Sequence, residues 1–316
     1  MSPKTRAWLQ LLRLPNLFTV PGDPLAGFTL GWLVLAARSS RPVDAIIVPA
    51  VLAMLASLLL YCAGLLANDY FDLEEDRRER PGRPLPSGRA NPRTVILAAV
   101  AMAVAAVALA YLAQGWACAA VAGALAVAIF AYDAWLKRTP VVGKLVMGGC
   151  RGLSCLLGSA AAGGLSVMAE PVVIAFAAGA AVYVAAVTAV AARETGQAPV
   201  GIRRLLPVAG MIAWLVALNM GGLVSCHALF LAFWPVGVLQ ILAVGWTIAC
   251  AESLKGVPAA TAAPPAVGKL IRGLLLVQAS VVLWFGVLGW AGLVPAAVLV
   301  AFWPISAIIG RRVYAS

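Results

Sequence analysis

Apolar segments long enough to cross a membrane follow one another along almost the whole chain. Hydrophobic residues make up 63% of the 316 positions and charged residues 11%, whereas an ordinary soluble domain is about 25% charged. A helix of about 20 apolar residues crosses the hydrocarbon layer, and lipid-facing segments must be helical because lipid offers the backbone no partners. We therefore predict an all-α, multi-pass integral membrane protein with ten helices. The expected helices lie near residues 15–37, 44–67, 93–112, 115–135, 143–166, 171–192, 204–224, 227–251, 268–290 and 292–310.

The basic residues fall on one side of the membrane when these segments alternate across it from a cytoplasmic N-terminus. Of the 23 lysines and arginines, only Arg38 and Arg41 then lie outside. Lysine and arginine are concentrated in the cytoplasmic loops of membrane proteins. The pattern predicts that both chain termini are cytoplasmic, in a membrane of the bacterial inner-membrane type. It also explains the formal net charge of +11 without nucleic acid, which we do not expect as a partner.

Charged residues recur at the cytoplasmic ends of alternate helices, which suggests a repeated plan. We expect one transmembrane domain over residues 1–316, made of two four-helix units at about 13–137 and 143–255 and of C-terminal helices within 268–312. Repeated units of this kind commonly enclose a binding site between them. The proline-containing stretch 253–268 is predicted to be a flexible loop. The charged ends are Asn68-Asp69 and Lys137-Arg138 in the first unit, and Arg193-Glu194 and Lys255 in the second.

The strongest local signal is a run of acids and arginines after the second predicted helix, NDYFDLEEDRRERPGRPLPSGR from Asn68 to Arg89. If the helix continues, residues three and four apart lie on one face, which brings together Asn68, Asp69, Asp72 and Asp76. Like charges at this spacing repel by about 0.2–0.5 kcal/mol per pair, so they need a counter-charge. Oxygen ligands suit a hard divalent cation, and Mg²⁺ binds through one or two carboxylates together with phosphate oxygens. We therefore predict a Mg²⁺ site; the alternative is a solvated loop whose acids pair with neighbouring arginines.

This run resembles the first motif of the UbiA superfamily of intramembrane prenyltransferases, NDxxDxxxD followed by an RPLPSG-type stretch. RLPNLFTVPGDPLAG, residues 13–27, is similar to the first helix of that family, where Asn16 matches a residue that faces the cavity. YDAWLKRTPVVGKLVMGGCRG, residues 132–152, is similar to its aromatic-lysine-arginine turn and glycine-rich fifth helix. The resemblance covers about residues 13–205.

The resemblance implies a UbiA-like bundle of nine to ten transmembrane helices around a central cavity, where an isoprenyl diphosphate binds through Mg²⁺ and basic residues. Departure of the diphosphate leaves an allylic cation, which a small acceptor, expected to be cyclic, captures. Metal ions, lysine and arginine stabilise a departing diphosphate, and apolar walls exclude water. The implied catalytic residues are Asn68, Asp69, Asp72 and Asp76, with Asn68, Asp72 and Asp76 as metal ligands. The implied substrate contacts are Arg13, Asn16, Asp23, Arg83, Lys137, Arg138, Arg193 and Glu194.

One departure concerns the second acidic motif of the family, DxxxD at the end of the sixth helix. This chain has AARETGQ there, with Glu194 as its one carboxylate and Arg193 before it. We expect Arg193 to contact the diphosphate where the family holds a second Mg²⁺. A degenerate second motif is similar to the EboC-like branch of the superfamily. The alternative function is a non-catalytic, UbiA-like lipid-binding or transport protein with an eroded second metal motif.

Four charged residues keep two interpretations each. Lys137 and Arg138 are either diphosphate contacts or ordinary membrane anchors. Asp23 is either a cavity acid near the acceptor or a satisfied polar group at a helix break. Arg151 either contacts phosphate or pairs with an acid such as Asp133, which itself stands four residues before Lys137.

Overall fold

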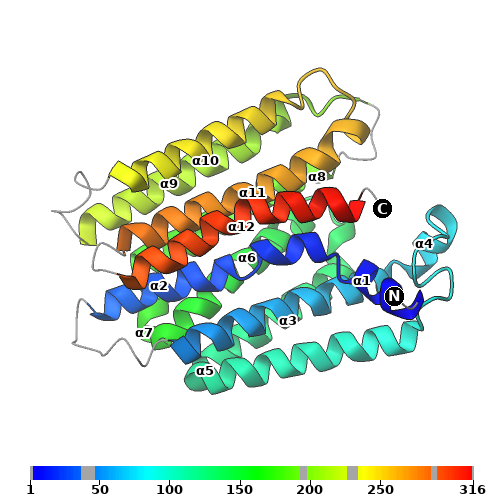
Figure 1. Ribbon diagram of the computed structural model, residues 1–316, viewed down its shortest axis with the longest axis horizontal. Helices are drawn as coiled ribbons and strands as arrows, with labels where there is room; N and C mark the ends of the chain where they lie inside the picture. The colour runs from blue at the N-terminus through cyan, green and yellow to red at the C-terminus, as the bar shows by residue number, and fades with distance from the viewer. Residues whose placement is uncertain (1–2, 37–46, 193–197, 226–233, 286–289, 315–316) are drawn as a thin grey trace.

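The computed structural model describes residues 3–36, 47–192, 198–225, 234–285 and 290–314. Nearly all of these residues are helical, and the long helices run side by side in one bundle (Figure 1). Within this part of the chain, seven helical stretches are long and apolar enough to cross a membrane, in α3, α5, α6, α8, η4 with α9, α10 and α11. The prediction of an all-α, multi-pass membrane protein is confirmed.

In chain order the elements are α1 (Pro3–Leu11), η1 (Leu14–Thr19), α2 (Gly22–Ala36), α3 (Ile47–Phe71), α4 (Leu73–Glu79), α5 (Pro92–Ala134), η3 (Leu136–Arg138), α6 (Val142–Gly163), α7 (Leu165–Met168), α8 (Pro171–Ala191), η4 (Gly201–Leu205), α9 (Leu206–Ser225), α10 (Trp234–Glu252), α11 (Ala259–Phe285) and α12 (Trp290–Tyr314).

The 43-residue helix α5 contains two of the predicted membrane segments, 93–112 and 115–135. Its backbone is not helical at Gln114 or at Gly115, where φ is 71°. Glycine adopts this left-handed conformation without the steric penalty of a side chain. The two halves face each other, because Ala103 and Ala126 line one apolar hollow between them. The predicted third and fourth helices are therefore present and are joined by a tight turn.

Helix α6 lies against α2 and α8 at backbone distance because glycines occupy the contacts. A Cβ atom on Gly158 would stand 1.9 Å from the carbonyl oxygen of Pro24 in α2. A Cβ atom on Gly148 would stand 2.2 Å from the carbonyl oxygen of Ala181 in α8. Small residues at helix interfaces permit this approach in membrane proteins. The glycine-rich stretch noted in the sequence thus places α6 between the first helix of the bundle and the second half.

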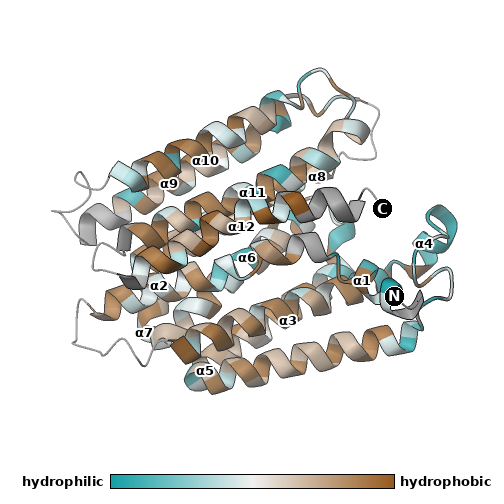
Figure 2. Cartoon of the chain, viewed as in Figure 1, coloured by the Kyte–Doolittle hydropathy of each residue, from teal (hydrophilic) through white to brown (hydrophobic). Residues whose placement is uncertain are grey.

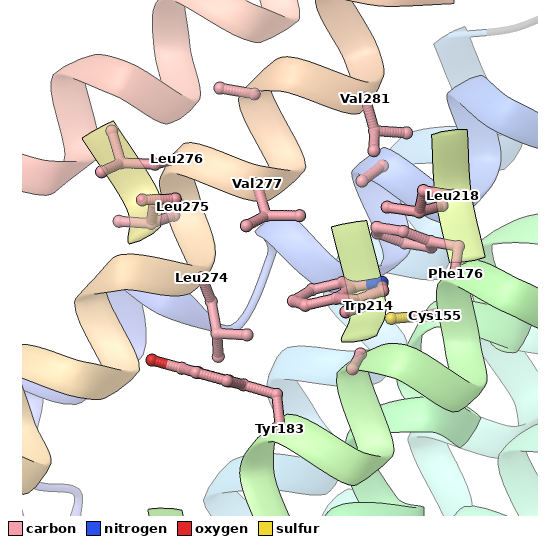
Figure 3. Close-up of a cluster of buried hydrophobic side chains, with 14 of the residues drawn as sticks. Cys155, Phe176, Tyr183, Trp214, Leu218, Leu274, Leu275, Leu276, Val277 and Val281 are labelled. Atoms are coloured by element: carbon pink, nitrogen blue, oxygen red, sulfur yellow. The ribbon is translucent and has the colours of Figure 1, made fainter. Parts of the chain in front are cut away.

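Large side chains fill the space between α8, α9 and α11 (Figure 3). Phe176 and Tyr183 of α8 lie beside Trp214 of α9, with ring centroids 5.5 Å and 6.2 Å from its own. The Tyr183 hydroxyl donates a hydrogen bond of 2.9 Å to the backbone carbonyl of Leu270 in α11. Aromatic packing and this polar contact together hold α8, α9 and α11 as one unit.

The most hydrophilic helix lies at one end of the bundle. Helix α4 is hydrophilic along its length, whereas the long helices are predominantly apolar (Figure 2). Helix α1 and the C-terminal end of α12 lie at the same end as α4 (Figure 1). The acidic run therefore stands where the apolar layer of the bundle stops.

The prediction of a flexible loop over residues 253–268 is wrong for most of its length. Helix α11 begins at Ala259 and includes Pro264 and Pro265. Proline removes one backbone donor, but the surrounding alanines have the highest helix propensity, and the helix continues through both prolines. The amide of Ala259 donates to the carbonyl of Ala198 at 3.2 Å, so this stretch is also tied to the segment before η4.

Candidate active site

The end of α3 arranges the acids of the first motif at helical spacing. The helix runs to Phe71 and α4 begins at Leu73, so the backbone stays nearly helical across Asp72. The Asp72 amide donates to the carbonyl of Asn68 at 2.9 Å, and the Asp76 amide donates to the carbonyl of Asp72 at 2.8 Å. The expected continuation of the helix is thus observed, with a short break at Asp72. Pro81 and Gly82 follow the end of α4, and the chain folds back toward the acids.

Asn68 and Asp72 share one cationic partner, Lys137 of η3. The Lys137 Nζ atom donates to Asp72 Oδ1 at 2.5 Å and to Asn68 Oδ1 at 3.4 Å. The Lys137 and Asp72 side chains are 15% and 20% exposed, so the pair is partly open to its surroundings. Two oxygen atoms from successive helical turns therefore converge on one cation position.

This oxygen pair fits a hard divalent cation. Mg²⁺ usually keeps several waters and takes one or two protein carboxylates together with phosphate oxygens, and Asn68 and Asp72 supply such an incomplete set. Within the described part of the chain, no three Asp, Glu, His or Cys side chains lie close enough to hold a metal by themselves. A cation bound here would therefore need oxygens from water or from a ligand.

Asp69 and Asp76 form a second group with Arg13 and Arg83. Arg13 donates to Asp69 at 3.0 Å, and Arg83 lies 2.6 Å from Asp76 and 3.6 Å from Asp69. Both acids are buried, at 6% and 4% exposure, whereas the two arginine side chains are 34% and 29% exposed. Asp76 thus faces Arg83 rather than the oxygens of Asn68 and Asp72. Its role as a metal ligand remains a prediction.

Arg13 has an unusual backbone conformation. Its φ of 43° and ψ of 53° place it in the left-handed region, which non-glycine residues seldom adopt and which costs about 1–2 kcal/mol. The strained residue stands between α1 and η1, and its guanidinium reaches back to Asp69 on α3. Such strain persists where surrounding contacts over-determine it and is concentrated at functional sites.

A third charged group lies within the bundle. Asp23 of α2 is 1% exposed and forms an ion pair with Arg151 of α6. Gln278 of α11 donates from Nε2 to the other carboxylate oxygen of Asp23 at 2.7 Å. The Arg151 guanidinium also lies 3.4 Å from the carbonyl oxygen and from the hydroxyl of Thr19. Of the two interpretations of Arg151, the structure therefore supports pairing with an acid, but the acid is Asp23 and not Asp133.

For the other predicted substrate contacts, the structure shows no ion pair with the acidic residues of the first motif among the described residues. Arg138 is exposed, and among the described residues no ion pair joins it to the acids. The side chain of Asn16 lies outside the described residues, as do Arg193 and Glu194. Their roles in substrate binding remain predictions.

Asp133, which the sequence offered as a residue at the mouth of the site or as an ion-pair partner, is a further acid at this end of the bundle. It is 4% exposed at the end of α5, and the charges of Lys137, Asp72, Arg13 and Asp69 act on its carboxylate. The signal in the sequence was its position four residues before Lys137, which suggested an ordinary ion pair at the end of a helix. The structure instead pairs Lys137 with Asp72.

Residues 25–260 match the model of the UbiA prenyltransferase family. The chain belongs to this family. The matched region begins in α2 and ends in α11, so it includes both Asn68-Asp72 and Lys137. The resemblance inferred from the first motif is thereby confirmed.

Known proteins of this family share part of the sequence and most of the fold. The chain is 34% identical over 158 residues to the digeranylgeranylglyceryl phosphate synthase of Methanopyrus kandleri. The aligned region covers 50% of this chain and 54% of that protein. It thus spans about half the length of the curated relatives it matches. The apo structure of a UbiA homologue from Aeropyrum pernix K1 has a TM-score of 0.63 at 18% identity, over 85% of this chain and 97% of the other. A UbiA homologue from Archaeoglobus fulgidus bound to DMAPP and Mg²⁺ has a TM-score of 0.55 at 18% identity, over 86% and 99%.

Proposed function

We propose that this UbiA family member is a Mg²⁺-dependent prenyltransferase that transfers the isoprenyl group of an isoprenyl diphosphate to a small acceptor in the membrane. The observation that carries the proposal is the convergence of Asn68 Oδ1 and Asp72 Oδ1 on one cation position. The solved family member bound to DMAPP and Mg²⁺ supports it. The distribution of the lysines and arginines along the sequence supports a cytoplasmic location for this site and for both termini.

We assign a role to each charged residue of the site from its contacts and its exposure. Asn68 and Asp72 would hold Mg²⁺, which when bound neutralises charge on the departing diphosphate. Lys137, Arg13 and Arg83 are partly exposed and can donate hydrogen bonds to diphosphate oxygens, as charge-assisted donors do. Asp69 and Asp76 are more deeply buried; we assign them to holding the two arginines in place until the ligand arrives.

The proposed identity of the acceptor is based on the names of the relatives and not on the residues of the site. Curated relatives are named digeranylgeranylglyceryl phosphate synthases. We infer that a prenylated glyceryl phosphate is the first acceptor to test, and that a cyclic acceptor is the second. A phosphorylated acceptor would suit the excess of basic residues at the charged end.

A specific observation also favours a second candidate function. Asp69, Asp72 and Asp76 are each paired with a lysine or an arginine, so the acidic group is neutralised without a metal. A non-catalytic, lipid-binding or transport protein of the UbiA fold could keep such a group for stability alone.

The two functions are separated by diphosphate release from purified protein in lipid nanodiscs. We expect release from geranylgeranyl diphosphate, geranyl diphosphate or DMAPP to require both Mg²⁺ and a host lipid extract as the source of acceptor. Asp72→Asn should abolish it, whereas Glu75→Gln, which removes an exposed acid of the same run, should leave it unchanged. Saturable binding of all three donors without release from any of them would establish the non-catalytic protein instead.

A further inference from the structure

Lys137 occupies the place that a divalent cation would take. Its Nζ atom is within hydrogen-bonding distance of both Asn68 Oδ1 and Asp72 Oδ1. A divalent cation bound to the same two oxygen atoms would stand close to the ammonium group, and the like charges would repel each other. We therefore expect binding of the cation to displace the ammonium group of Lys137.

A displaced Lys137 needs another counter-charge close by. Its side chain is 15% exposed, and an unpaired charge in such a setting is costly. Asp133 meets the need, because it is 4% exposed, stands four positions before Lys137 in the chain and lies within range of the lysine charge. Among the described ion pairs of 4.0 Å or less, Asp133 takes part in none. Its carboxylate is thus buried and, among the described ion pairs, is not joined to the lysine.

The backbone explains why Lys137 and Asp133 stand apart in this state. Residues at i and i+4 face each other on a continuous helix, but Trp135 between them is not helical, with φ at −138°. The break ends α5 and starts η3, which turns Lys137 toward Asp72 between α3 and α4. The lysine side chain has several staggered rotamers, and a change of rotamer moves its ammonium group without a change in the backbone.

We propose that Asp133 is a positioning residue that receives the ammonium group of Lys137 when a divalent cation binds between Asn68 and Asp72. Lys137 then stays beside the cation, where it can donate to a bound diphosphate. The inference rests on the proposed function, since it assumes the cation position at Asn68 and Asp72. It adds a residue that acts through Lys137 and does not itself touch the metal.

The test is a titration of the full-length protein in nanodiscs with Mn²⁺ alone, followed by electron paramagnetic resonance of the free ion. Four proteins form a double-mutant cycle: the unchanged chain, Asp133→Asn, Lys137→Met and the double variant. Asp133→Asn should weaken Mn²⁺ binding about tenfold when Lys137 is present, because the displaced ammonium group has lost its counter-charge. In the Lys137→Met background the same change should have an effect at least about fivefold smaller.

Two further variants make the result specific. Asp133→Glu keeps the negative charge and should restore most of the Mn²⁺ affinity lost in Asp133→Asn. Glu75→Gln removes an exposed acid at the same end of the bundle and should change the affinity less than about twofold, because water screens exposed charges. The thermal unfolding midpoint of each variant shows that the bundle is intact.

The outcomes separate this inference from the proposed function. Equal losses from Asp133→Asn in the two backgrounds, or no loss in either, would overturn the role of Asp133 while Asp72-dependent Mn²⁺ binding still supported the metal site. Absence of any Mn²⁺ binding that depends on Asp72 would overturn the proposed function and this inference together.

Discussion

Two groups of buried acids in this molecule are neutralised in different ways. At the end of the bundle, Asp69 and Asp76 pair with Arg13 and Arg83, whose side chains are 34% and 29% exposed. Inside the bundle, Asp23 is enclosed at 1% exposure. Its partners Arg151 and Gln278 come from two other helices and occupy both of its oxygens. The first arrangement leaves the two arginines about one-third exposed, whereas Arg151 in the second is 15% exposed. On the proposed function, the end group is the one that binds ligand, while the internal group joins α2, α6 and α11.

The largest expected effect is loss of the internal group by Asp23→Ala. Removing one partner of a buried ion pair destabilises by about 3–5 kcal/mol, because the other charge remains buried and unpaired. We expect a sharp fall in folded yield and in the thermal unfolding midpoint in detergent. The double variant Asp23→Leu, Arg151→Met removes both charges and should recover much of the loss. A double variant no more stable than Asp23→Ala would show that the pair does more than join the helices.

At the other end of the bundle, Asp72→Asn should affect turnover rather than folding. Loss of a preorganised charge at a transition state reduces turnover by about 10²–10³-fold, and Asn nearly conserves the volume. The unfolding midpoint should stay close to that of the unchanged chain. A large drop in the midpoint, similar to that of Asp23→Ala, would place Asp72 with the structural group and weaken the comparison.

Asp76→Asn should have an intermediate effect on substrate affinity. Its partner Arg83 would lose a charge-assisted hydrogen bond, which contributes about 1.5–3 kcal/mol before solvent screening. Because the Arg83 side chain is 29% exposed, solvent screening lowers this contribution, and we expect KM for the diphosphate donor to rise about threefold to tenfold, with little change in kcat. Steady-state kinetics at saturating Mg²⁺ measure both constants. If the Mg²⁺ requirement rises in this variant instead, Asp76 is a metal ligand, as its position in the motif first suggested.

The smallest effect is expected from Glu74→Gln. Glu74 pairs with Arg77, but their side chains are 75% and 53% exposed, and exposed ion pairs contribute about 0–1 kcal/mol. Turnover and the unfolding midpoint should change within measurement error. A clear loss of turnover would show that the ligand-binding group includes the exposed face of α4.

Much of the site could be predicted because it depends on helical spacing. Asn68, Asp72 and Asp76 lie one turn apart whatever the rest of the chain does, since the backbone rises and turns by fixed amounts. The partners of these residues could not be predicted in the same way. Local spacing suggested that Lys137 pairs with Asp133, and the break at Trp135 decided against it.

The sequence by itself determined that this is a membrane bundle of the UbiA type with an acidic helix end, because run length, charge bias and motif spacing are local properties of the chain. The tertiary structure decided which charges meet. Lys137 and Asp72 are 65 positions apart, Arg151 and Asp23 are 128 apart, and Gln278 and Asp23 are 255 apart. Such contacts depend on how glycine-lined helices such as α6 approach their neighbours, and no local pattern encodes that distance.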